Sequence, residues 1–167
     1  MPKILRKIKK SRWYGADEID WLAEGEVQAE ALADLETQSN ALSVWIIEDD
    51  DSNLRRVVAA LAAKCGSRTN VDYVTIDQKR IDDIGLLMQQ TNGDSPDSTA
   101  NSKWHRDLLQ LTVNGVAALA AELSANGERK RMTWPKVKAV VQKSVDAGYF
   151  SLNDIAAEDL RKYFEPK

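Results

Sequence analysis

The sequence is poor in the residues that build covalent cross-links and metal centres, and each shortage excludes a class of protein. Cys65 is the one cysteine, which excludes an internal disulfide and a zinc site made of several cysteines. His105 is the one histidine, which excludes paired-histidine metal motifs and leaves a single imidazole base. No stretch approaches the roughly 18 apolar residues of a membrane span, and the basic start lacks the apolar run of a signal peptide. We therefore expect a cytoplasmic protein that makes no contact with a membrane.

The composition is that of an ordinary globular protein, with 43% hydrophobic and 29% charged residues. A chain of 167 residues is long enough to bury a core of its own. We predict a single domain over residues 1–167. The alternative is a subdivision at residues 91–102, the polar loop TNGDSPDSTANS.

The net charge of −3 conceals a strong segregation along the chain. Residues 1–16 form a basic N-terminal segment with six basic side chains and no acid. Residues 17–127 contain 20 acids and 8 bases, and residues 128–143 contain six bases and one acid. Two basic segments thus flank an acidic middle, an arrangement that favours binding of charged partners.

Two short stretches rich in β-branched and aromatic residues predict strands, at residues 42–47 and 71–76. Between them, apolar residues recur at helical spacing over residues 53–64. The 23 residues from Glu48 to Asn70 suit one right-handed crossover, so we predict that the two strands pair in parallel.

The other apolar patterns are helical. The predicted helices cover residues 17–35, 81–88, 103–125 and 133–148, and a last one begins with a capping box of Ser151 and Asp154. The predicted fold class is therefore α+β and predominantly helical. It has one βαβ unit with two short parallel strands, followed by a helical second half.

The stretch VWIIEDD, followed by a predicted helix, resembles the opening of a response-regulator receiver domain. The resemblance implies that Glu48, Asp49 or Asp50 holds magnesium and that Asp77, after the second strand, accepts a phosphoryl group. In the doubly wound order of that fold, a helix, a strand and a second helix separate the two positions. The connection between the predicted strands has room for one helix, so the resemblance ends with the second strand.

The acids of residues 48–51 have a simpler interpretation as the start of a helix. Carboxylates in and before a first turn complement the positive end of the helix dipole, each by about 0.3–1 kcal/mol when exposed. Asp51 or Ser52 can supply the oxygen that caps the first amides. The alternative is a magnesium or calcium site shared with Asp77 or Asp82, since such ions prefer carboxylate ligands. Our prediction is no metal and no cofactor.

The two basic segments combine cations with aromatic rings, which contact phosphates and stack on bases in nucleic-acid complexes. Binding of RNA or single-stranded DNA is predicted for Lys7, Lys9, Lys10, Arg12, Arg129, Lys130, Arg131, Trp134, Lys136 and Lys138. The alternative is that these side chains are solvated or dock on the acidic middle of the same chain. Convergence of both segments on one groove would favour nucleic acid.

Aromatic residues beside charge at the starts of elements have the composition of protein interaction hot spots. By this criterion the predicted partner-binding residues are Trp13, Tyr14 and Trp104. His105 and Asp107 fall on a predicted helix, where residues so close in sequence do not face each other. The sequence therefore does not predict that they form a catalytic pair.

The leading hypothesis is a non-enzymatic cytoplasmic interaction protein, a regulatory or accessory subunit of a larger assembly. An antitoxin-like or immunity-like inhibitor is one instance, because an acidic middle can mimic nucleic acid toward a basic partner. The first alternative is a nucleic-acid-binding protein that uses the two basic segments. The second is a metal-dependent or phosphoryl-transfer enzyme that uses the carboxylates.

Overall fold

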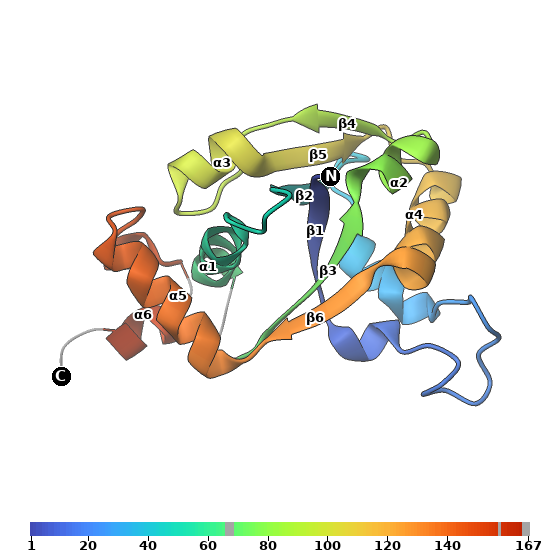
Figure 1. Cartoon of the computed structure of the whole chain (residues 1–167), viewed down its shortest axis with the longest axis horizontal. Coiled ribbons are helices and arrows are strands. Elements are labelled where there is room, and N and C mark those ends of the chain that lie inside the picture. Colours follow the sequence, from blue (N-terminus) through green and yellow to red (C-terminus); the bar gives the residue numbers. More distant parts are fainter. Residues whose placement is uncertain (66–68, 157, 165–167) are drawn as a thin grey trace.

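The structure is a computed structural model that describes residues 1–65, 69–156 and 158–164. Its centre is a six-stranded sheet in the order β4-β5-β2-β1-β3-β6, in which each pair of neighbours is antiparallel (Figure 1). The strands are β1 (Lys3–Ile8), β2 (Leu42–Ile47), β3 (Val71–Asp77), β4 (Leu87–Gln90), β5 (His105–Leu109) and β6 (Glu128–Met132).

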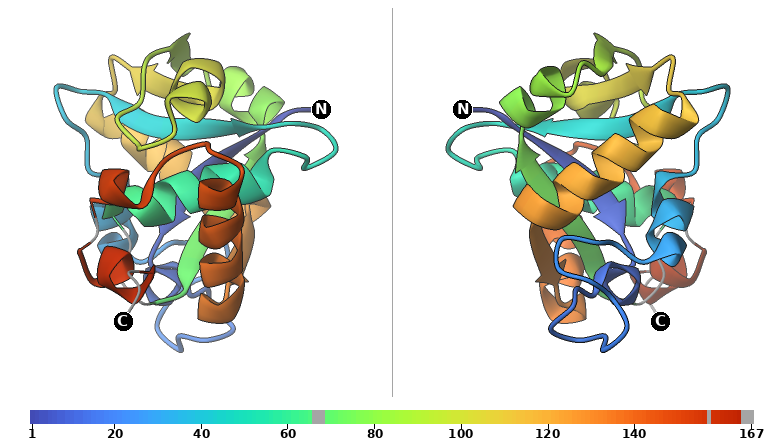
Figure 2. Two further views of the ribbon diagram at one scale, coloured as in Figure 1. Left: turned by 90° about the vertical axis from the view of Figure 1, so that its left-hand side faces the viewer. Right: turned by 90° about the vertical axis from the view of Figure 1, so that its right-hand side faces the viewer.

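Helices cover both faces of the sheet (Figure 2). One face carries α1 (Leu54–Cys65), α3 (Ser98–Trp104), α5 (Trp134–Asp146), α6 (Glu158–Phe164) and the short 3-10 helix η3 (Leu152–Asp154). The other face carries α2 (Gln78–Asp83), α4 (Val113–Asn126) and the 3-10 helices η1 (Lys10–Trp13) and η2 (Ala29–Leu35). Each layer of helices buries one hydrophobic core against the sheet. None of the helices in these ranges is long and apolar enough to cross a bilayer.

Strand β1 contributes to both cores because its aliphatic residues point to both faces of the sheet. Leu5 packs in the core that contains α1, whereas Ile4 and Ile8 pack in the core that contains α4. A strand that is buried on both faces belongs in the middle of a sheet. The basic N-terminal segment is therefore a central element of the fold as well as a source of charge.

The predicted fold class is wrong in its strand pairing. The strands expected at residues 42–47 and 71–76 are confirmed as β2 and β3, and the helix between them is α1. They do not pair in parallel, because β1 lies between them and is antiparallel to both. Ile4 of β1 is in register with Ile46 on one side and with Ile76 on the other. The crossover through α1 thus spans an inserted strand, which apolar spacing within the crossover cannot indicate.

The predicted helical second half is also corrected. The helix expected over residues 103–125 is divided into α3, β5 and α4. Gln110 adopts a left-handed backbone conformation (φ 55°) directly after β5, and this turn separates the strand from α4. The helix expected over residues 81–88 is replaced by α2 and β4, and the one expected over 17–35 by η2 alone. The helix expected over 133–148 is confirmed as α5, and the capping box of Ser151 and Asp154 is confirmed in η3.

The position of β1 makes a prediction about stability. Replacing Leu5, which is 0% exposed, by alanine leaves a cavity beneath α1 and is expected to lower the free energy of unfolding by about 2–5 kcal/mol. The matched control is Leu87→Ala on the edge strand β4, where leucine is 49% exposed and a change within about 0.5 kcal/mol is expected. Urea unfolding followed by tryptophan fluorescence measures both. Equal losses in the two variants would contradict a central β1.

Candidate functional site

The acidic cluster of residues 48–51 forms a closed turn at the end of β2. Glu48 Oε2 accepts a hydrogen bond from Ser52 Oγ at 2.6 Å, and Asp50 Oδ1 accepts one from the Ser52 amide at 3.0 Å. Hydrogen bonding to Asp50 from the side chain and the backbone of Ser52 lowers the pKa of Asp50. Asp49 pairs with the ammonium group of Met1 at 2.8 Å. Three of the four carboxylates therefore have partners within the chain.

The start of α1 is held by Asn53, the residue after the two that the sequence pattern favoured. The Asn53 side chain is buried, donates to the Ile46 carbonyl at 2.9 Å and accepts from the Glu48 amide at 3.0 Å. The side-chain amide of Asn53 thus links the end of β2 to the start of α1. Asn53 was missed because it follows a run of acids that already looked sufficient for a cap.

The cluster and Asp77 do not form one acidic site. Ile47 and Asp77 are each in register with Lys3, on opposite sides of β1, so two strand spacings, about 10 Å, separate them. Within the described ranges of the chain, no three His, Cys, Asp or Glu side chains are grouped so that they could hold a metal ion. The acidic cluster and Asp77 are therefore two separate groups of carboxylates.

Glu48 instead belongs to the rim of an open groove. Its Oε1 accepts a hydrogen bond from Trp104 Nε1 at 3.1 Å. Together they form one wall of a groove of about 530 Å³ between the first turn of α1, the end of α3 and the second half of α5. We call it the Arg56 groove, and its main lining residues are Glu48, Arg56, Trp104, Val140, Lys143 and Tyr149.

Arg56, in the lining of this groove, is held in place by an acid and two aromatic rings. Its guanidinium lies 3.5 Å from the centroid of the Tyr149 ring and 5.5 Å from that of Trp104. Its Nε and Nη2 donate to the two oxygens of Asp97 at 2.5 and 2.8 Å. Asp97 is 0% exposed, and its bonds raise the pKa of Arg56. A bidentate pair of this kind holds the arginine in one orientation, with its aromatic contacts already made.

Asp97 also determines where Trp104 lies. It caps α3, accepting a hydrogen bond from the Ala100 amide at 2.9 Å. Because Trp104 is the last residue of α3, the same carboxylate that orients Arg56 fixes the helix that carries the tryptophan. The sequence signal was present in the segment DSTA, an aspartate followed by a possible first helical turn, inside what the sequence pattern predicts as loop.

The three predicted partner-binding residues lie in different parts of the structure. Trp104 lies in the Arg56 groove. Trp13 is 1% exposed and its indole nitrogen donates to Asp34 at 2.8 Å, so this side chain packs in the core with η2 and α4. Tyr14 is 37% exposed and follows η1, outside the lining of the groove.

The predicted nucleic-acid-binding segments lie on either side of β3. Lys7 of β1 is in register with Tyr73, and Tyr73 is in register with Lys130 of β6. Asp72 joins the segments, since it accepts two bonds from Arg131 at 2.6 and 2.9 Å and one from the Lys10 amide at 3.2 Å. The arginine lowers the pKa of Asp72. The two segments are thus neighbours through an acidic residue of the middle of the chain.

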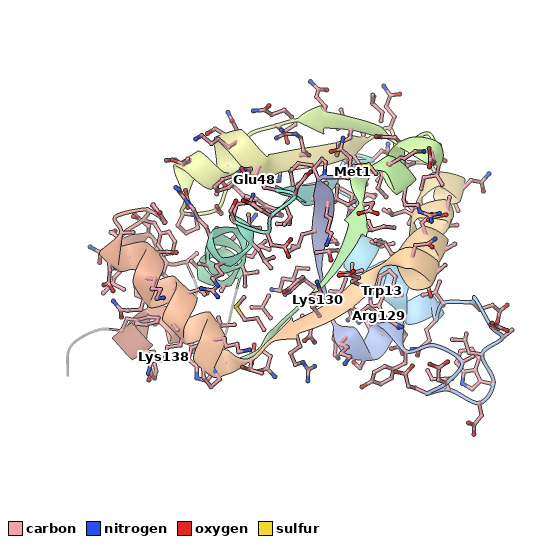
Figure 3. The ribbon with its side chains drawn as sticks, viewed as in Figure 1. Met1, Trp13, Glu48, Arg129, Lys130 and Lys138 are labelled. Carbon is pink, nitrogen blue, oxygen red and sulfur yellow. The ribbon has the colours of Figure 1, made fainter. Side chains whose placement is uncertain are left out.

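Several of these cations are engaged within the molecule. The pairs are Arg12 with Asp34, Arg129 with the Trp13 carbonyl, Lys130 with Glu128, Arg131 with Asp72, and Lys138 with the Tyr163 hydroxyl. Trp134 packs edge to face on Tyr163, with ring centroids 5.6 Å apart. Lys138 on α5 stands apart from Arg129 and Lys130 on β6 (Figure 3). Lys9 and Lys136 are exposed. The structure therefore places much of this charge in internal contacts.

His105 lies on β5, where residues two apart share a face of the sheet. Its Nε2 is 3.9 Å from Asp107 Oδ1, and its Nδ1 is 2.9 Å from the Thr91 hydroxyl. The same Asp107 oxygen accepts a bond from Ser43 Oγ at 2.9 Å. In a nucleophile–base pair the serine would donate to the histidine, and here it donates to the aspartate. The helix predicted from the sequence concealed this grouping.

The buried Asp97–Arg56 pair makes a prediction about stability. Asp97→Asn removes the charge partner of Arg56 and is expected to lower the free energy of unfolding by about 3 kcal/mol. The control is Asp83→Asn, which breaks the exposed pair with Lys79 and is expected to cost at most about 0.5 kcal/mol. The loss in each variant is measured from its urea unfolding midpoint relative to the wild type. A small loss in both would show that Asp97 does not organise the groove.

His105 makes a prediction about pH. Burial lowers its pKa in the folded chain, and Asp107 opposes this effect only in part. The unfolded chain therefore takes up this proton at a higher pH than the folded chain, so the stability is complete above about pH 6.5 and decreases as the pH falls below it. Urea midpoints at pH 7, 6 and 5 should decrease in the wild type and change less in His105→Asn. An identical decrease of the urea midpoint with pH in both proteins would contradict the assignment of this pH dependence to His105.

Compared with protein-family models, with curated proteins and with solved structures, the chain shows no significant match.

Proposed function

We propose that this protein is a non-enzymatic cytoplasmic interaction protein, a regulatory or accessory subunit that binds a protein partner through the Arg56 groove. One observation carries the proposal. An arginine in an open groove is held against two aromatic rings by a fully buried carboxylate. Arginine, tryptophan and tyrosine are the residues in which interface binding energy concentrates.

The pre-organisation of Arg56 supports this role. A flexible arginine loses side-chain entropy when it is fixed in an interface, at a cost of about 0.5–1.5 kcal/mol. Here Asp97 and Tyr149 already hold the guanidinium in place. A partner can therefore use the flat stacked surface without ordering it first.

The lining of the groove indicates the chemistry of the partner. Val140 of α5 and Ala147, the residue after this helix, give the groove apolar surface, and Tyr149 is 42% exposed. Arg55 and Lys143 are exposed at the rim, and the charge of Arg56 is balanced by Asp97. A segment with an apolar or aromatic side chain next to a carboxylate would be complementary to this surface.

The test compares two tyrosines of similar exposure. The full chain is tagged and isolated from its native cell, and the stoichiometric partner is identified and titrated. Tyr149→Ala should weaken binding of that partner by roughly thirtyfold, the effect of a 2 kcal/mol hot spot. Tyr14→Ala, which alters a tyrosine outside the groove lining, should bind as the wild type does. Absence of a stoichiometric partner, or equal loss in both variants, would overturn the proposal.

A further inference from the structure

The two central strands of the sheet separate halfway along their length. β1 pairs with β2 only as far as Leu5 and Trp45. Beyond this point β1 remains paired with β3 as far as Ile8, and the first half of β2 remains paired with β5 from Leu42. Strands that part within a sheet leave backbone groups without a ladder partner, and other groups must satisfy them.

Arg6 occupies the opening between the separated strands. Its Nη1 donates to the Ser43 carbonyl of β2 at 2.7 Å, and its Nε donates to the Asp34 carbonyl of η2 at 2.9 Å. These two carbonyl oxygens orient the guanidinium across the opening. The sheet thus presents a fixed positive group where its ladder is interrupted.

A cavity of about 390 Å³ lies at this opening. We call it the Arg6 cavity. Its charged lining residues are the cations Arg6, Lys7, Lys9 and Lys64 and the carboxylates Asp34 and Asp94, an excess of two positive charges. The volume is within the range of small-molecule sites.

The two carboxylates are already engaged by donors. Asp34 accepts from Arg12 at 2.7 Å, from the indole of Trp13 at 2.8 Å and from the Lys9 amide at 2.8 Å. Asp94 is bonded to Lys64. These contacts use the carboxylate oxygens, and the lining holds two more cations than carboxylates, a balance that favours an anion.

The inner wall of the Arg6 cavity is aromatic. The ring of His105 meets that of Trp45 edge to face, with centroids 5.1 Å apart, and both side chains are buried. Leu61 of α1 completes this side. A ligand held here would have a charged end toward β1 and a planar or apolar body toward Trp45.

We infer that the Arg6 cavity binds a small phosphorylated organic molecule. Its dianionic phosphate lies among Arg6, Lys7 and Lys9, and its organic body lies against Trp45 and His105. A phosphate monoester carries close to two negative charges at neutral pH, which matches the excess charge of the lining. Arginine and lysine together are the usual ligands of phosphate oxygens. This site lies at the last turns of α1 and the Arg56 groove at its first turn, so the two inferences are independent.

The experiment titrates the purified full chain, without a partner, by calorimetry at low salt. The probes are AMP, adenosine and inorganic phosphate. AMP is expected to bind with a Kd at least tenfold below that of inorganic phosphate, and adenosine is expected not to bind. Lys9→Met should weaken AMP binding roughly tenfold by removing one charge-assisted bond. Lys136→Met removes an exposed lysine of α5 outside the cavity lining and should leave it unchanged.

The urea midpoint of Lys9→Met should equal that of the wild type, since the Lys9 side chain is exposed. No AMP binding at millimolar concentration, or unaltered binding in Lys9→Met, would overturn the inference. Inorganic phosphate that binds as tightly as AMP would overturn the role of the aromatic wall. Equal weakening by Lys9→Met and Lys136→Met would show a general charge effect and would overturn the site.

Discussion

The buried carboxylate of Asp97 is the interaction that holds α1 and α3 together and so positions the Arg56 groove. A carboxylate without solvent costs several kcal/mol unless its oxygens are satisfied. Asp97 accepts two bonds from Arg56 and one from the first turn of α3. Loss of the pair with Arg56 would leave a carboxylate unpaired in the interior, so the segment before α3 is tied firmly to α1. That segment carries Asp94 to the cavity, and α3 carries Trp104 to the groove.

Helix α1 lies between the two sites and is otherwise a plain structural helix. Its Val57, Val58 and Leu61 are buried against the sheet. Its first turn offers Arg55 and Arg56 to the groove, and its last turns offer Leu61 and Lys64 to the cavity. The apolar stripe therefore determines the fold, while the polar residues at the two ends determine the chemistry.

Local sequence patterns correctly predicted the elements that can be recognised without knowing which strands or helices pack beside them. β2, α1, β3 and α5 each have a clear period and clear ends, and the structure contains all four. β1 was missed because its aliphatic residues point to both faces, so no alternation appears, and its cations look like a surface segment. β5 was missed because HRDLL follows a helical stretch directly, and only pairing with β2 and β4 reveals it as a strand.

The candidate sites divide in the same way. Trp104 could be proposed as a binding residue from the sequence alone, because it is an aromatic residue next to charged ones. The pairing of Arg56 with Asp97 could not, because the two residues are far apart in the sequence and Asp97 falls in a polar stretch typical of loops. The grouping of His105, Asp107 and Ser43 requires both the strand and its register. Chemistry that depends on register is not accessible to a pattern that reads one segment at a time.

The central place of β1 has a consequence for how the chain folds. Lys3 is in register with Ile47 and with Asp77, so in the growing chain β1 has no partner strand until roughly forty more residues follow and no second partner until roughly seventy follow. Contacts of such long sequence separation slow folding and leave strand edges open meanwhile. The density of lysine and arginine in β1 acts during this interval as well, because like charges discourage two nascent chains from pairing through that edge.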